Sequence, residues 1–241
     1  MGTVYAAVDT ALERRVAAKV LREDLVEGRI AAQRFQSEAQ LVAGLAHPNV
    51  VTVHDIGMAG SRAFFIMELL EGETLRAELS RAGSLDPARA LSVMRGICAA
   101  VEAAHQRQMI HRDLKPENIF LCANSVPKVL DFGLAKALER TGGPLLTEAG
   151  TVAGTRPYMA PEHLRGDEPS PDWDLWALAV IALEMVTGDL GVTPDGVAGL
   201  VPAQRQFFAR ALAPDPLDRP TSAMQLLEQF DRALTCNELQ S

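Results

Sequence analysis

The spacing of hydrophobic residues changes along the chain. In the first seventy residues, short stretches rich in Val, Phe and Ile are separated by turn residues, which is the pattern of β-strands. These stretches are residues 3–8, 15–21, 50–56 and 63–70. Between the second and third, residues 28–47 carry apolar side chains at helical spacing, and His47-Pro48 ends that pattern. We therefore predict a mostly antiparallel sheet with one helix.

Helical spacing dominates from Thr74 onward. In residues 84–108, Asp86 has the position of an N-cap and Pro87 that of the first helical residue. Residues 172–188 are apolar on nearly every face, so this helix should be buried at the centre of its lobe. Residues 221–234 form an amphipathic pattern that Thr221 could cap. The predicted class is α+β, with a β-rich and an α-rich lobe that meet near Glu71 and Gly72.

Charge and cysteine content narrow the classes of function. The formal net charge of −8 argues against a nucleic-acid partner, which would require clustered Lys and Arg. The three cysteines are far apart, so they predict neither a disulfide framework nor a zinc site and fit a reduced cytoplasmic setting. The most apolar run is interrupted by Glu184 and is too short to span a bilayer. We expect a cytoplasmic protein.

The segment HRDLKPEN, residues 111–118, carries the strongest chemical signal. In a loop, Asp113 can accept a hydroxyl proton while Lys115 neutralises a phosphoryl group that is being transferred. Asn118 can hold a metal ion, and Asp131 of VLDFG follows a short apolar strand. Carboxylate and amide oxygens suit Mg²⁺, a hard cation that keeps water and phosphate as its other ligands.

A lysine in a predicted strand adds a second element. Lys19 lies in VAAKVL, and Glu38 lies on the following predicted helix. A buried lysine needs a counter-charge, which Glu38 could supply while Lys19 reaches a nucleotide phosphate. Alone, such a lysine is more often a surface residue, so its meaning depends on the other motifs.

Together these motifs resemble a known family. HRDLKPEN, DFG, APE and DPLDRP occur in the order found in protein kinases. The chain is similar to the eukaryotic-like, or Hanks-type, serine/threonine protein kinases of bacteria, from Gly2 to about Leu234. The resemblance implies a bilobal protein-kinase-like fold in a single domain, 1–241, with a small lobe, 1–70, and a larger helical lobe, 71–241.

The resemblance implies roles for individual residues in an ATP- and Mg²⁺-dependent transfer to Ser or Thr of protein substrates. Asp113 would be the catalytic base or the carboxylate that orients the hydroxyl, and Lys115 would be the partner of the γ-phosphate. Asn118 and Asp131 would hold Mg²⁺. Lys19, paired with Glu38, would fix the α- and β-phosphates.

An adenine site is also implied. Gly2 would belong to the glycine-rich loop over the phosphates, Met67 would be the gatekeeper, and the backbone of Glu68 and Leu70 would bind the adenine edge. The apolar residues against the ring would be Val4, Ala17 and Phe120. For Val4, Ala17, Phe120 and Met67, plain core packing explains the residue type equally well.

Other residues are expected to support the site. By resemblance, Val42, Val53, His111 and Phe132 would stack between the lobes. A buried Asp174 must find hydrogen-bond donors, which the backbone of the HRDLKPEN segment, the catalytic loop at residues 111–118, could supply. Glu162 of APE is expected to form a structural salt bridge with Arg219 of DRP.

Residues 134–159 resemble an activation loop. Thr147 and Thr151 are candidates for autophosphorylation, in which a homodimer could act, and Thr141 is a weaker candidate. For each of them an ordinary solvated loop residue is an equally good interpretation. Thr155 is expected to hydrogen-bond Asp113 and Lys115.

Two departures from the family pattern favour an alternative. Only the last part of the glycine-rich loop is present before Val4, with no first strand, and the segment 189–213 is shorter than in the family. A pseudokinase-like nucleotide-binding or scaffold module would tolerate both departures, whereas the intact catalytic motifs favour an enzyme. A small-molecule phosphotransferase fits less well, because such enzymes usually lack RDLKPEN and GTRPYMAPE.

Overall fold

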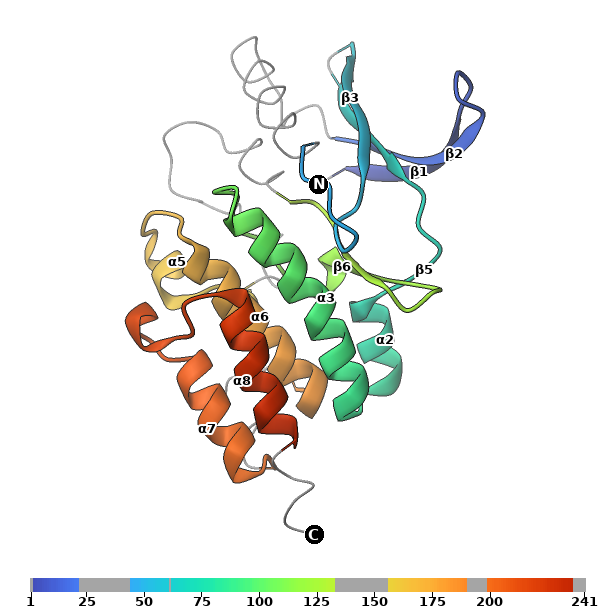
Figure 1. Cartoon of the computed structure of the whole chain (residues 1–241). Coiled ribbons are helices and arrows are strands. Elements are labelled where there is room, and N and C mark those ends of the chain that lie inside the picture. Colours follow the sequence, from blue (N-terminus) through green and yellow to red (C-terminus); the bar gives the residue numbers. More distant parts are fainter. Residues whose placement is uncertain (1, 22–43, 61, 133–155, 190–198, 236–241) are drawn as a thin grey trace.

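A computed structural model describes residues 2–21, 44–60, 62–132, 156–189 and 199–235. A smaller β-rich lobe packs on a larger helical lobe, and the chain passes between them near β5 (Figure 1). This arrangement confirms the predicted α+β, two-lobed fold. Most of the helix expected at residues 28–47 lies outside the described residues.

The smaller lobe contains a four-stranded antiparallel sheet with the order β1-β2-β4-β3. Its strands are β1 (Thr3–Asp9), β2 (Arg14–Val20), β3 (Val53–Ala59) and β4 (Arg62–Glu68). The third strand begins later than expected because the residues before it pair elsewhere: Val50 bridges Val129, and the Val51 N–H donates to the Val129 carbonyl at 3.0 Å. The same residues therefore tie the smaller lobe to the larger one.

A second, three-stranded sheet begins the larger lobe. It consists of β5 (Gly72–Thr74), β6 (Ile119–Cys122) and β7 (Pro127–Val129). Gly72 has a φ of +144°, and a Cβ there would lie 2.1 Å from the Leu121 carbonyl oxygen, so only glycine fits where the chain enters this sheet. The sequence predicted the short strand before Asp131, which is β7, but it did not predict β5 or β6.

Helices make up the rest of the larger lobe. They are α2 (Leu75–Ala82), α3 (Pro87–His105), α5 (Pro161–Arg165), α6 (Pro171–Thr187), α7 (Pro202–Ala211) and α8 (Ala223–Thr235), with 3₁₀ turns η2 (Pro116–Asn118), η3 (Arg156–Tyr158) and η4 (Pro216–Asp218). None of the helices in the described ranges is long and apolar enough to cross a membrane.

The helix ends follow their capping residues. Asp86 caps α3 by accepting a hydrogen bond from the Arg89 N–H at 3.0 Å, as expected. At α8 the expected cap is wrong by one residue: the Ser222 hydroxyl accepts from the Gln225 N–H at 3.1 Å, and the Thr221 N–H donates to the Gln225 side chain. Serine and threonine both cap well, so residue type alone could not separate these neighbours.

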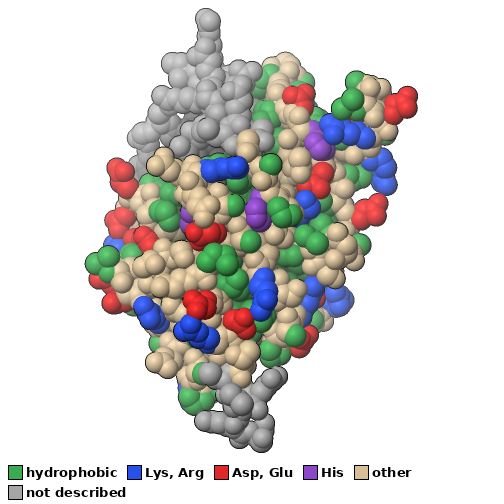
Figure 2. Space-filling view, in the orientation of Figure 1, with side chains coloured by type: hydrophobic (Ala, Val, Ile, Leu, Met, Phe, Trp, Pro, Cys, Tyr) green, Lys and Arg blue, Asp and Glu red, His purple; other side chains and the backbone are tan. Residues whose placement is uncertain are grey.

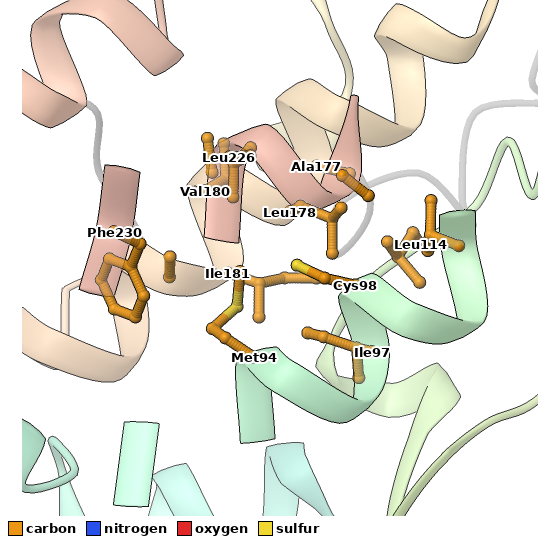
Figure 3. Packing of buried hydrophobic residues seen from close by; sticks show 14 of the residues in the cluster. Met94, Ile97, Cys98, Leu114, Ala177, Leu178, Val180, Ile181, Leu226 and Phe230 are labelled. Carbon is orange, nitrogen blue, oxygen red and sulfur yellow. The ribbon is translucent and has the colours of Figure 1, made fainter. Parts of the chain in front are cut away.

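The hydrophobic core lies between α3, α6 and α8 (Figure 3). Met94 and Ile97 of α3, Ile181 of α6, and Leu226 and Phe230 of α8 are fully buried there. Burying each such side chain stabilises the fold by about 1.5–3 kcal/mol, so the core fixes α6 firmly. On the surface, acidic and basic side chains are interspersed over the face in Figure 2.

Candidate functional site

The loop that carries HRDLKPEN is anchored to α6 by hydrogen bonds from its backbone to Asp174. Asp174 is buried, and its carboxylate accepts hydrogen bonds from the N–H groups of His111 at 2.8 Å and Arg112 at 3.0 Å. His105, at the end of α3, places its Nε2 2.8 Å from the same carboxylate. The expected anchoring of the loop by Asp174 is confirmed. Sequence reasoning missed His105, although its place at the helix end directly before the loop was a usable signal.

Three of the predicted site residues meet within this loop. Lys115 Nζ donates to both carboxylate oxygens of Asp113, at 2.9 and 2.8 Å. Asn118 Nδ2 donates to the Asp113 carbonyl at 2.7 Å and to its carboxylate at 3.3 Å. The turn η2 begins at Pro116 and brings Asn118 back toward Asp113. Because Lys115 and Asn118 are largely buried, fixed donors hold the Asp113 side chain in one place.

Asp131 and Lys19 form the second part of the site. Asp131 follows β7 with a φ of +61°, and its carboxylate forms an ion pair with Lys19 Nζ of β2. The Leu130 N–H donates to the Asn118 carbonyl at 2.8 Å, and this bond joins the segment of Asp131 to the HRDLKPEN loop. Glu38, the expected partner of Lys19, lies outside the described residues. Among the residues that the structure describes, Asp131 is the carboxylate that Lys19 contacts.

The stack expected between the lobes is partly visible. The rings of His111 and Phe132 meet edge to face with centroids 4.8 Å apart, and His111 Nε2 lies 2.8 Å from the Leu130 carbonyl oxygen. Val53 packs against the core cluster. Val42 lies outside the described residues.

The residues expected around adenine come from both lobes. Gly2 directly precedes β1, and Val4 lies at its start. Ala17 lies on β2, opposite Met67 of β4, whereas Phe120 lies on β6 and Leu70 in the connection between the lobes. Ala17 is buried, and Val4 is 55% exposed, so core packing does not explain Val4.

Glu68, at the end of β4, is fixed through both its backbone and its side chain. Its N–H donates to the Thr52 carbonyl at 3.0 Å. Its carboxylate accepts from the Thr52 N–H and from Lys128 Nζ, both at 2.7 Å. Burial alone would raise the pKa of Glu68, but the bonds from Lys128 and Thr52 outweigh it and hold the pKa below its usual value.

The predicted salt bridge between Glu162 and Arg219 is confirmed. Arg219 Nη1 and Nη2 donate to the two carboxylate oxygens of Glu162 at 2.6 and 2.8 Å. Arg219 is fully buried, donates to the Ala213 carbonyl at 2.8 Å and lies 4.8 Å from the centre of a Trp176 ring. This bidentate pair joins α5 to the residue that follows η4.

The four threonines of the expected activation loop, Thr141, Thr147, Thr151 and Thr155, lie outside the described residues. The same holds for residues 190–198 in the segment expected to be short. The described part of that segment contains α7.

The donor set of the site fits Mg²⁺ bound together with phosphate. Asp131 offers carboxylate oxygens. The Asn118 side chain offers its amide oxygen, because its amide nitrogen is the group that donates a hydrogen bond to Asp113. Among the described residues there is no group of three or more His, Cys, Asp or Glu that could hold a metal. A site with few protein ligands is what Mg²⁺ uses when substrate phosphates and water complete its coordination.

A two-lobed α+β fold with a lysine on the sheet, and an Asp-Lys-Asn loop beside a second Asp, defines the protein kinase class. The family model for the protein kinase domain matches residues 1–197, and the chain belongs to this family.

The chain is similar to bacterial proteins named as serine/threonine-protein kinases. It is 36% identical to PknD of Mycobacterium tuberculosis over 258 residues, which cover 99% of this chain and 38% of PknD. It is 38% identical to pkn3 of Myxococcus xanthus over 250 residues, which cover 92% of this chain and 46% of pkn3. The chain thus spans less than half the length of these relatives.

The fold is similar to a solved kinase domain. A crystal structure of a mutant PknI kinase domain from M. tuberculosis matches with a TM-score of 0.77 and 25% sequence identity, over 97% of this chain and 90% of that one.

Proposed function

We propose that the chain is the catalytic domain of a serine/threonine protein kinase. It would transfer the γ-phosphoryl group of ATP to Ser or Thr hydroxyls of proteins. The observation that carries the proposal is the meeting of Asp113, Lys115 and Asn118 in one loop beside Asp131 and Lys19. In this proposal residues 1–70 form the small lobe and residues 71–241 the large lobe of one domain, with a shortened segment at 189–213.

Each residue has a definite task in the proposed reaction. The substrate hydroxyl oxygen attacks the γ-phosphorus, the bond from that phosphorus to the bridging oxygen of ADP breaks, and the hydroxyl proton passes to a carboxylate oxygen of Asp113. Lys115, which already contacts Asp113, neutralises charge on the transferred group. Mg²⁺, when bound through Asn118 and Asp131, supplies further charge neutralisation.

The nucleotide is held by residues of both lobes. Lys19 would turn from Asp131 to the α- and β-phosphates, with Glu38 as its counter-ion, and Gly2 would approach the phosphates. The adenine ring would lie between Val4 and Ala17 on one side and Phe120 on the other, beside Met67, with its edge on the backbone of Glu68 and Leu70. The exposure of Val4 supports this placement.

The setting and partners follow from the same proposal. The cytoplasm supplies ATP and keeps thiols reduced, and the described cysteines, Cys98 and Cys122, are free. Autophosphorylation of Thr147 or Thr151 within a homodimer would regulate the domain.

The test is transfer of ³²P from ATP to a generic basic protein, compared with the Asp113→Ala and Lys19→Met variants. Loss of the base should lower the rate by a factor of about 10² to 10⁴. Asp55→Ala, at an exposed carboxylate on β3, is the matched control and should keep full activity. Transfer by the wild-type protein at the level of Asp113→Ala would refute the proposal, and stabilisation by Mg-ATP without transfer would indicate a nucleotide-binding module.

A further inference from the structure

One lysine of the larger lobe holds the last residue of a strand in the smaller lobe. Lys128 lies in the middle of β7, and its Nζ donates to a carboxylate oxygen of Glu68, at the end of β4, at 2.7 Å. The same Nζ donates to the Val50 carbonyl at 3.4 Å. The side chains of Lys128 and Glu68 are 15% and 26% exposed, so salt and water screen this ion pair less than one on the surface. The pair therefore ties the two lobes together.

A short segment, residues 49–52, is bonded to both strands that carry the ion pair. The Val51 N–H donates to the Val129 carbonyl of β7 at 3.0 Å. Thr52 exchanges two hydrogen bonds with Glu68: the Thr52 N–H donates to the Glu68 carboxylate at 2.7 Å, and the Thr52 carbonyl accepts from the Glu68 N–H at 3.0 Å. The ion pair thus closes a continuous set of hydrogen bonds that runs from β4 through this segment to β7.

Lys128 also lies beside the residue expected below the adenine ring. In the register of β6 and β7, Lys128 is directly opposite Phe120. Residues directly opposite each other in antiparallel strands have their side chains on the same face of the sheet. In the proposed function, Phe120 is the floor of the adenine site and the backbone of Glu68 is its edge. Lys128 therefore contacts one of these two residues and is the strand neighbour of the other.

We propose that Lys128 is a positioning residue for the adenine ring. By holding Glu68 while it lies opposite Phe120, it fixes the distance between the edge and the floor of a site whose two sides come from different lobes. Without the ion pair, the two sides match for only part of the time, and the affinity for the ligand falls by that fraction. The inference rests on the proposed kinase function. Because that function assigns the phosphates to other residues, the effect of Lys128 falls on the adenosine part of the nucleotide.

Isothermal titration calorimetry with two ligands tests this role. The ligands are adenosine, which carries no phosphate, and Mg-ADP. In Lys128→Met, which removes the charge, both dissociation constants should rise by the same factor of about 10, the lower end of the range for a lost hydrogen bond between charged groups. Lys19→Met should weaken the binding of Mg-ADP only, because Lys19 binds the phosphates in the proposed function.

Arg15→Met is the matched control. Arg15 of β2 forms an ion pair with Glu71, in the connection between the lobes, at 3.6 Å, but these side chains are 71% and 77% exposed. An exposed ion pair contributes little, so both dissociation constants should stay within about twofold of the wild-type values. Lys128→Arg keeps the positive charge and should recover part of the loss, because a guanidinium can still donate to Glu68.

Glu68→Gln removes the other half of the ion pair and keeps a side-chain oxygen for the Thr52 N–H. Adenosine should bind about fivefold more weakly to this variant, since a neutral acceptor forms a weaker bond with Lys128. The double variant with Lys128→Met should bind adenosine no more weakly than Lys128→Met alone, because both substitutions remove the same pair. If Lys128→Met fails to fold, wild-type adenosine affinity in Glu68→Gln would still overturn the proposal.

Amide hydrogen exchange reports the contact between the lobes separately from ligand binding. The N–H groups of Val51 and Thr52 are bonded to Val129 and Glu68, so a peptide that covers residues 49–53 reports both bonds. Lys128→Met should speed exchange in this peptide, and Arg15→Met should not. Faster exchange together with wild-type adenosine affinity would mean that the ion pair is only structural, which overturns the positioning role.

The results separate this inference from the proposed function. A wild-type protein that binds adenosine but transfers no more phosphate than Asp113→Ala would refute the kinase function and leave the role of Lys128 at an adenine site intact. A protein that transfers phosphate, with a Lys128→Met variant that binds both ligands like Arg15→Met, would overturn the role of Lys128 alone. Weaker binding of Mg-ADP without weaker binding of adenosine would also overturn it, because the effect would then lie at the phosphates.

Discussion

Asp174 illustrates how one buried side chain controls a loop. Its two oxygens accept hydrogen bonds from consecutive backbone N–H groups and from His105, so the loop cannot shift without leaving a buried carboxylate unpaired. The helix α6 around it is buried on nearly every face, which fixes Asp174 itself. The position of Asp113 therefore depends on the core as much as on its own loop.

Replacing Asp174 by Asn should destabilise the fold and lower activity together. The amide offers one acceptor oxygen and places an NH₂ group against the N–H donors of the loop, so we expect a loss on the order of 3 kcal/mol in the free energy of unfolding. Denaturant unfolding measures this loss. Asp172→Asn, in the first turn of the same helix, should change stability by less than about 0.5 kcal/mol. Equal unfolding midpoints for the two variants would contradict the anchoring role.

At this scale the sequence predicted residues that belong to contiguous motifs and missed those that act across space. Asp113, Lys115 and Asn118 are close in sequence, and a tight turn brings them together. By contrast, Arg76 of α2 donates hydrogen bonds to the side chains of Glu117, Tyr158 and Glu184. These partners lie 41, 82 and 108 positions away in the sequence, so no local pattern could reveal this cluster.

Between elements, the Glu162–Arg219 pair fastens α5 to η4. Both residues are buried, and Arg219 also donates to the carbonyls of Ala213 and Pro214. Burial alone would raise the pKa of Glu162, but the hydrogen bonds from Arg219 outweigh it, so the pKa lies below the ordinary value of 4.5. The ionised carboxylate is therefore favoured by folding.

This lowered pKa makes the pair acid-sensitive. The stabilisation is fully present above the unfolded pKa near 4.5 and is lost as the pH falls through the lower folded value. The difference in unfolding free energy between the wild-type protein and Glu162→Gln should therefore shrink below about pH 4.5. Thermal or denaturant unfolding across this range measures it. Glu168→Gln, at an exposed glutamate, should differ from the wild type by a constant amount, and a constant difference for Glu162→Gln would contradict the prediction.

Long elements with a clear period were predictable, whereas of the short strands in the larger lobe the sequence predicted β7 before Asp131 and missed β5 and β6. The helices α3, α6 and α8 follow the apolar spacing of their sequences, because tertiary packing and local pattern agree there. The strands β5 and β6 have three and four residues and depend on pairing with each other and with β7, which no short pattern specifies. The late start of β3 has the same origin, since Val50 and Val51 pair with β7.

At the scale of the whole molecule, the buried apolar residues that the structure describes are concentrated in the larger lobe. The core cluster is made of residues from its helices, its short strands and their connections, with Leu45 and Val50 joining from the smaller lobe, whereas β1 is mostly exposed. Segments with few buried contacts open locally at lower free energy than core helices.

Amide hydrogen exchange should therefore differ between the lobes. We expect amides of β1, residues 3–9, to exchange faster than those of α6, with α3 as the reference in the same core. Peptide-level mass spectrometry measures both in one sample. Equal protection of β1 and α6 would mean that the molecule opens as a single cooperative unit.

The ion pair between Lys19 and Asp131 has a mechanical consequence. It links a strand of the smaller lobe directly to the segment after β7, and so limits how far the lobes can separate. A ligand that takes over either partner replaces this bond with one that runs through the ligand itself. The range of motion between the two lobes then depends on whether a ligand occupies the space between Lys19 and Asp131.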